Sequence, residues 1–240
     1  MRVAAVQFKA DQADVEGSRQ RLVSLADQAA PNSDLVVLPE LAHTGYLFPD
    51  RAAVARVAEV ADGPTCALLA EVAARHRCWV VAGFAEREGT TLYNSARIID
   101  DQGVLQFVYR KTLLFDADVP WAAVGNTGYR RFETAAGAFG VGICMDLNDD
   151  RFVAWCAGAD LAAIAFPTAW LEQGIDVWRY WALRLLGVPA ALVAANTFGF
   201  ERGVEFSGRS AILQKNRILA AAGRVGSGVI RGVVGAAVRR

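Results

Sequence analysis

The sequence has little of what metal sites, disulfide frameworks and nucleic-acid-binding surfaces need. It holds 4 cysteines and 2 histidines in 240 residues, and no pair of them has the close spacing that is typical of zinc ligands. The 25 basic and 25 acidic side chains cancel, so charge gives no reason to expect nucleic acid as a partner, and the closing pair Arg239-Arg240 is too short to change this. We expect neither a structural metal nor a nucleic-acid partner.

Long apolar runs are also missing. No run reaches the roughly 20 residues that a membrane-spanning helix needs, and the opening MRVAAVQFKADQ lacks the apolar stretch and cleavage site of a secretory signal. We expect a soluble, cytoplasmic protein without membrane contact, in a reducing compartment where disulfides are disfavoured. No linker rich in serine, glycine or charge divides the chain, so one domain over residues 1–240 is expected.

The hydrophobic pattern predicts an α/β protein with mixed sheets. Short apolar or alternating segments indicate strands, and segments with helical spacing lie between them. Short turns after Ala85 and Ile99 predict antiparallel hairpins, and Thr112–Thr127 reads as irregular. The expected helices are Val15–Ala30, Thr65–Arg77 (with Thr65 as N-cap) and Val177–Leu186, and the expected strands are Arg2–Phe8, Leu35–Leu38, Trp79–Ala85, Leu92–Ile99, Val104–Tyr109, Phe139–Cys144, Leu161–Phe166, Ala190–Ala195, Gly208–Leu213 and Val229–Val234.

Three polar residues come at the ends of apolar strands. Glu40 follows LVVLP, Lys111 follows FVYR, and Cys144 follows GVGI. Ligand sites in α/β sheets gather beyond the carboxyl ends of strands, where loops meet. We therefore expect a carboxylate, an ammonium and a thiol to share one pocket.

These three groups suit acyl transfer without histidine, metal or cofactor. A free thiol is mostly protonated at neutral pH, so a cysteine nucleophile benefits from a nearby base, which Glu40 would supply. The ammonium of Lys111 would favour the thiolate and stabilise negative charge on a tetrahedral intermediate. A backbone N–H after Cys144, at Met145 for example, would complete an oxyanion hole if the chain turns sharply there.

The segments around these residues resemble a known family. PELAHTGY (39–46), YRKTLLF (109–115) and GICMDLN (142–148) are similar to the three signature segments of the nitrilase superfamily of carbon–nitrogen hydrolases. GADLAAIAFPTAW (158–170), VAANTFG (193–199) and FSGRSAI (206–212) follow in order, so the resemblance spans nearly the whole chain. Within the superfamily, CMDLN and the stretch from FDAD to Trp121 look most like the N-terminal amidase branch, which deamidates terminal Asn or Gln.

The resemblance implies a fold and a set of roles. The fold is a four-layer α-β-β-α sandwich with two mixed β-sheets, usually assembled into homodimers or larger homo-oligomers. Glu40 would be the base, Lys111 the stabilising charge and Cys144 the nucleophile that forms a thioester. Many members place a second Glu a few residues after the Lys, but here the stretch reads DADVPW. Asp116 or Asp118 would have to replace that Glu, and Asp118 has the more suitable position.

Several other residues have two possible interpretations. Aromatic residues near the signature segments are candidates for the substrate pocket or for core packing, namely Tyr46, Trp121, Trp170 and Phe198. Asp146 is expected to order the turn after the nucleophile. The remaining histidines and cysteines are expected to be bystanders or packing residues, and these are His43, His76, Cys66, Cys78 and Cys156.

Three functions remain open from the sequence. The first is an amidase that releases ammonia from a small or terminal carboxamide. The second is a nitrile hydrolase of the same fold, because thioimidate and thioester intermediates need similar sites. The third is a catalytically degenerate member that binds or scaffolds, which the missing second Glu suggests.

Overall fold

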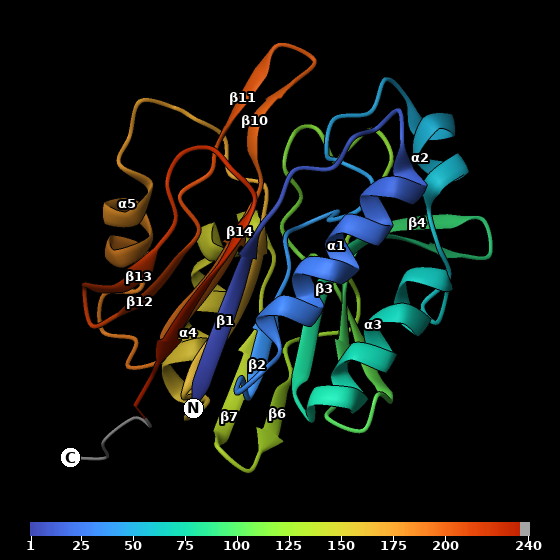
Figure 1. Cartoon of the computed structure of the whole chain (residues 1–240). Helices are drawn as coiled ribbons and strands as arrows, with labels where there is room; N and C mark the ends of the chain where they lie inside the picture. The colour runs from blue at the N-terminus through green and yellow to red at the C-terminus, as the bar shows by residue number, and fades with distance from the viewer. Residues whose placement is uncertain (236–240) are drawn as a thin grey trace.

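The computed structural model describes residues 1–235, so the pair Arg239-Arg240 lies outside the described residues. Two six-stranded mixed sheets form its centre (Figure 1). The first has the order β14-β1-β2-β3-β4-β5, with strands β1 (Arg2–Gln7), β2 (Leu35–Val37), β3 (Trp79–Glu88), β4 (Thr91–Ile99), β5 (Leu105–Arg110) and β14 (Gly228–Val233). The second has the order β13-β12-β9-β8-β7-β6, with strands β6 (Arg131–Thr134), β7 (Gly137–Val141), β8 (Ala163–Thr168), β9 (Ala191–Asn196), β12 (Ala211–Gln214) and β13 (Arg217–Ala221).

The two sheets share one plan. In the first, β1, β2 and β3 are parallel neighbours, and in the second, β7, β8 and β9 are parallel neighbours. The outer strands pair antiparallel, including the predicted hairpins β3-β4 and β4-β5, which are confirmed. A further ribbon of β10 (Phe198–Glu201) and β11 (Val204–Ser207) extends from the second sheet's end of the molecule (Figure 1).

Alternating side chains of the first sheet build two separate cores. Val3 and Ala5 of β1 face the second sheet, whereas Ala4 and Val6 belong to a cluster with Leu22 of α1. Successive strand residues point to opposite faces, so a strand buried on both sides must be apolar throughout. This explains the uninterrupted apolar runs in the sequence.

Helices cover the outer faces of both sheets, which gives the four-layer α-β-β-α sandwich (Figure 1). Helices α1 (Val15–Ala29) and α3 (Pro64–His76) pack on the first sheet, and α4 (Asp150–Gly158) and α5 (Val177–Arg184) pack on the second. Helix α2 (Arg51–Val57) follows the loop after β2. Among residues 1–235, no helix has the length and apolar character that a membrane crossing requires.

The prediction of Thr65 as N-cap was wrong. Gly63 occupies the N-cap position of α3 and Pro64 the first helical turn, an arrangement that suits proline because its missing N–H would have no helical partner. Thr65 instead donates its hydroxyl to Glu59 at 2.7 Å. The Thr65 hydroxyl therefore binds the Glu59 carboxylate instead of capping the helix.

Other boundaries moved for local reasons. The strand expected over Phe139–Cys144 ends at Val141, because the chain turns into a short 3-10 helix, η1 (Cys144–Asn148). The strand expected from Gly208 begins only at Ala211, because Gly208 and Arg209 both adopt positive φ, which an extended strand does not accommodate.

Candidate active site

Glu40 lies in a tight loop directly after β2, where its side chain is fully buried. The loop packs so closely on β3 that a Cβ added to Gly83 would lie 2.5 Å from Glu40 Cα and 2.5 Å from the Pro39 carbonyl oxygen. Gly83 N–H donates to that carbonyl at 3.1 Å, and Ala42 N–H donates to the Gly83 oxygen at 3.0 Å. Glycine at this point of β3 therefore allows the backbone that carries the carboxylate to sit directly on the sheet.

Lys111 follows β5 and bridges two carboxylates. Its Nζ lies 2.7 Å from Glu40 Oε1 and 2.5 Å from Asp118 Oδ2. Asn94 of β4 reinforces the bridge, because its Nδ2 donates to Glu40 Oε1 at 2.7 Å and to Asp118 Oδ1 at 3.0 Å. The side chains of Lys111, Glu40 and Asp118 are between 0% and 1% exposed, so the contacts operate with little screening.

Asp118, rather than Asp116, contacts the lysine. The loop after Lys111 turns back at Phe115, whose N–H donates to Asp118 Oδ2 at 3.1 Å. Asp116 is exposed. Asn94 was missed by the sequence analysis, and its only signal was an amide side chain in the middle of the strand TLYNSARII.

Cys144 opens the turn η1 with φ of +45°. A non-glycine residue in this left-handed region is uncommon and persists where the surroundings fix it. Asp146 does so, because its Oδ2 accepts the Ile143 N–H at 2.9 Å and the Tyr109 hydroxyl at 2.7 Å. The expectation that Asp146 orders this turn is confirmed.

The same carboxylate reaches the loop after Lys111. Asp146 Oδ1 accepts the N–H groups of Thr112 and Leu113 and the Thr112 hydroxyl, each at 2.9 Å. One buried side chain therefore joins the cysteine turn to the lysine loop.

Burial and charge set the protonation of the three groups. Burial raises the pKa of the Cys144 thiol, the charge of Glu40 raises it further, and Lys111 opposes both. Burial likewise raises the pKa of Glu40, against the opposing charge of Lys111. Burial alone would lower the pKa of Lys111, but Glu40 and its other anionic neighbours raise it well above its usual value. The site thus holds a neutral thiol beside a lysine that stays charged.

Glu40 Oε2 is the carboxylate oxygen that points away from the lysine bridge. It accepts the Ala169 N–H at 2.8 Å, and the Ala169 backbone also lies beside the Cys144 sulfur. Ala169 follows β8, so the ends of β2, β5, β7 and β8 meet around one point. The convergence of Glu40, Lys111 and Cys144 that the sequence predicted is present.

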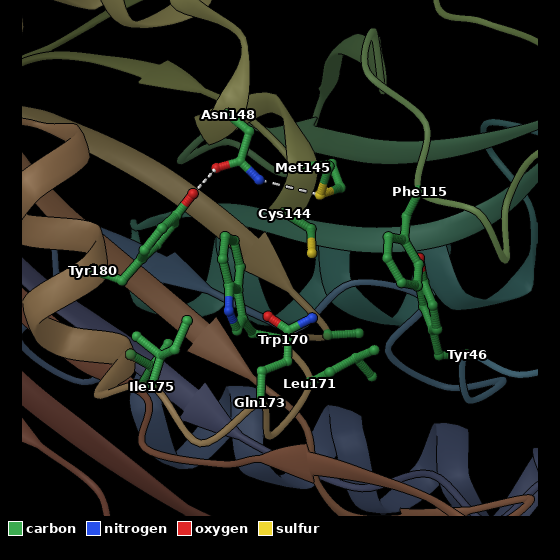
Figure 2. Close-up of a pocket in the computed structure, with 12 residues that line it drawn as sticks. Tyr46, Phe115, Cys144, Met145, Asn148, Trp170, Leu171, Gln173, Ile175 and Tyr180 are labelled. Atoms are coloured by element: carbon green, nitrogen blue, oxygen red, sulfur yellow. Dashed lines mark hydrogen bonds between the residues drawn. The ribbon is translucent and has the colours of Figure 1, made fainter.

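A cavity of about 340 Å³ opens onto Cys144. Figure 2 shows the sulfur directed into it, with Trp170 on one side and Phe115 on the other. Tyr46 and Trp170, two of the four aromatic candidates for the substrate pocket, line the cavity, and so does Met145, whose N–H was expected to complete the oxyanion hole. Sequence reasoning missed others, notably Phe115, Asn148, Ile175 and Tyr180.

Trp121 and Phe198, the other two aromatic candidates, lie outside the cavity lining. Trp121 is 5% exposed and packs edge-on against Phe48 in a core cluster, apart from the cavity lining. Phe198 lies half-buried on β10, also outside the lining. Core packing, the alternative interpretation, therefore describes Trp121.

The remaining histidines and cysteines lie away from the cavity. His43 is fully buried and its Nε2 lies 3.3 Å from Glu59 Oε1, and His76 contacts Asp27 at 2.9 Å. Cys66, Cys78 and Cys156 are buried free thiols. No group of three or more potential ligand side chains within residues 1–235 is arranged to hold a metal ion.

Comparisons with known proteins agree on one family. The carbon–nitrogen hydrolase family model matches residues 2–237. A protein named nitrilase from Pyrococcus abyssi is 32% identical over 216 residues, which cover 88% of this chain and 80% of that protein. A protein N-terminal amidase from Schizosaccharomyces pombe is 28% identical, and the alignment covers 99% of this chain and 96% of that protein.

Solved structures share the fold. An amidase from Nesterenkonia sp. superposes with a TM-score of 0.85 at 21% identity, covering 97% of this chain and 89% of that one. A mutant of that amidase shows covalent addition of the acetamide moiety of fluoroacetamide at its active-site cysteine. An N-terminal amidase with an Asn-Glu-Ala peptide superposes with a TM-score of 0.82 at 20% identity, covering 96% of each chain. Because the family model matches almost the full length of this chain, the chain belongs to the carbon–nitrogen hydrolase family and is a hydrolase of the nitrilase superfamily.

Proposed function

We propose that this hydrolase cleaves small or terminal carboxamides, releasing ammonia through a thioester on Cys144. The observation that carries the proposal is the buried Lys111, bridged between Glu40 and Asp118 next to the cysteine. A buried charge pair with an additional carboxylate is costly to maintain and clusters at functional sites. Packing of the core alone gives no reason for a buried lysine between two carboxylates.

Acylation would begin with proton transfer from the Cys144 thiol to Glu40. The pKa of the thiol is raised, so few thiolates exist in the resting site and the proton must leave as the sulfur attacks. Oε2 is the suitable acceptor, because Oε1 already accepts from Lys111 and Asn94. The raised pKa of Glu40 strengthens it as a base.

The sulfur would add to the amide carbon and form a tetrahedral intermediate. Its oxyanion would be stabilised by Lys111 Nζ and by the N–H of Met145, the residue after the nucleophile. Cleavage of the carbon–nitrogen bond would expel ammonia, which takes the proton held by Glu40. The acyl group remains on the sulfur as a thioester.

Deacylation would use the same base. Glu40 takes a proton from water, the hydroxide adds to the thioester carbon, and the carbon–sulfur bond breaks. The carboxylic acid leaves and the sulfur regains its proton from Glu40. Throughout, Lys111 keeps its charge, and Asp118 with Asn94 would position it.

Intact-protein mass spectrometry with an amide library tests this proposal. We expect ammonia release and a mass gain on the cysteine equal to the acyl group, and the loss of both in Cys144→Ala. Turnover that persists in this variant would refute the mechanism. Since the Pyrococcus abyssi relative is named a nitrilase, matched nitriles belong in the same library, and activity on nitriles with none on the corresponding amides would favour nitrile hydrolysis.

We further propose that the chain works in the cytoplasm as a homodimer or larger homo-oligomer. Four free thiols suit a reducing compartment, and helix α5 exposes Leu183 at 66% while Leu186, just beyond it, is 68% exposed. Contiguous exposed apolar side chains are typical of protein–protein contacts. Sedimentation equilibrium would show a monomer if the oligomer proposal is wrong.

A further inference from the structure

The cavity at Cys144 lacks a charged side chain in its lining. Its described lining consists of aromatic, aliphatic, sulfur and amide groups, and none of them is Asp, Glu, Lys, Arg or His. Phe115 and Trp170 flank the sulfur, and Ile175 and Tyr180 form the wall further along (Figure 2). A ligand here meets apolar surface on several sides.

The amide of Asn148, one of the polar groups in this lining, already has partners. Asn148 Oδ1 accepts the Tyr180 hydroxyl at 2.7 Å, and its Nδ2 donates to the Met145 sulfur at 3.2 Å (Figure 2). A charged substituent would have to displace these contacts to be solvated by this amide, and the Tyr46 hydroxyl, which has no hydrogen-bond partner among the described residues, is a neutral group that supplies no counter-charge. Gln173, by contrast, is exposed in the segment between β8 and α5.

The charged residues next to Cys144 do not supply a counter-charge for a ligand in this uncharged lining. Lys111 is fully buried and already contacts two carboxylates, so its charge is matched before a substrate arrives. Two charged residues near the lining pair elsewhere, Glu172 with Arg224 at 2.9 Å and Arg184 with Asp150 at 2.8 Å, and two others, Asp176 and Arg179, are exposed.

We propose that the preferred substrate is an uncharged carboxamide with an apolar acyl group, and that the lining rejects carboxamides with a carboxylate or an ammonium on the acyl chain. The inference rests on the proposed amidase function and names its substrate class.

The physical reason is desolvation. Moving an ion into an apolar lining without a counter-charge costs several kcal/mol, and each tenfold in an equilibrium constant corresponds to about 1.4 kcal/mol. We therefore expect charged amides to be disfavoured by about 100-fold or more. A terminal Asn residue carries an α-ammonium, so the same reasoning predicts that peptides with this terminus are poor substrates.

Three amides of matched length provide the test, namely pentanamide, 5-aminopentanamide (cationic) and the monoamide of glutaric acid (anionic). Ammonia release should give a kcat/KM for pentanamide about 100-fold above either charged analogue. A charged analogue that is hydrolysed as well as pentanamide, or an N-terminal Asn peptide hydrolysed better, would overturn the inference. Either result would leave the amidase proposal intact.

Binding separates the two proposals. In Cys144→Ala, or in Cys144→Ser if the alanine variant does not fold, calorimetry measures affinity without turnover. Tighter binding of pentanamide than of both charged analogues would support the proposed substrate class, whether or not the wild-type protein hydrolyses them. If the wild-type protein hydrolyses none of the three amides, that absence of turnover would refute the amidase function but not the proposed substrate class. Equal or tighter binding of a charged analogue overturns the inference.

A change of charge in the lining provides a second test. Gln173→Arg should raise the kcat/KM ratio of the anionic amide to pentanamide by about two- to fivefold, the range expected of an exposed ion pair. Gln173→Met is the matched control without charge. Gln102→Arg adds the same charge in the exposed turn before β5 and should leave the ratio unchanged. An equal ratio in all three variants would contradict the inference.

Discussion

Replacing Asp118 by Asn tests whether the second carboxylate positions the lysine. Both oxygens of Asp118 accept hydrogen bonds, Oδ2 from Lys111 and Phe115 and Oδ1 from Asn94. An asparagine has a single acceptor oxygen, so its amide NH₂ must face at least one donor. A lost buried hydrogen bond with a donor facing a donor costs about 2–4 kcal/mol. Urea unfolding should show a loss of this size.

The activity of Asp118→Asn should change in a recognisable way. The charge of Asp118 raises the pKa of Glu40, so its removal lowers that pKa and moves the acidic limb of the kcat/KM profile to lower pH. A displacement of the ammonium by about 1 Å would reduce kcat/KM about 100-fold. Steady-state ammonia release across pH measures both effects. Unchanged kcat/KM with an unmoved acidic limb would refute the reasoning, whatever the stability of the variant.

Three further predictions concern other parts of the molecule. Gly83→Ala should lower kcat at least tenfold and destabilise the fold by about 1–3 kcal/mol, whereas Gly158→Ala, where an added Cβ meets nothing within 4 Å, should do neither in the same assays. Burial would raise the pKa of Glu59, but His43, whose Nε2 lies 3.3 Å from that carboxylate, and nearby charges hold this pKa well below its usual range. The folded state therefore binds this proton less readily than the unfolded chain, whose Glu pKa is about 4.3, and stabilisation present above that pH is lost as the pH falls. Glu59→Gln should flatten the decline of Tm between about pH 5 and pH 3, and a parallel decline in both proteins would contradict this. Iodoacetamide should modify Cys144 alone in the native protein, because the other three thiols are buried away from the cavity, and peptide mapping that finds equal modification elsewhere would contradict this.

The long periodic elements could be predicted from sequence. The structure has β1, α1, β4 and α5 within a few residues of their predicted bounds, because each has a clear period and covers a large apolar surface. Other elements were not predicted, namely α2, α4, η1, β6, β10, β11 and β13. Strand β13, for example, is mostly exposed, so it has no apolar alternation to detect.

The candidate site was predictable only in part. Glu40, Lys111 and Cys144 each follow an apolar run, which is a local signal. The role of Asn94 as a donor to two carboxylates depends on partners 54 and 24 residues away, and no local pattern contains that information. The position of Trp121 stayed open for the same reason, since neither interpretation of an aromatic residue after a signature segment is favoured by its neighbours in sequence. The single domain over residues 1–240 stays a prediction.

Asp146 fixes the cysteine turn and the lysine loop with one carboxylate, so the sulfur and the ammonium form a single mechanical unit. The wall that meets the acyl group comes largely from a different stretch, between Ala169 and Tyr180. Substitutions in that stretch can therefore change which acyl groups fit the cavity while leaving the reacting groups in place. A scaffold divided in this way can acquire new substrates without rebuilding its chemistry.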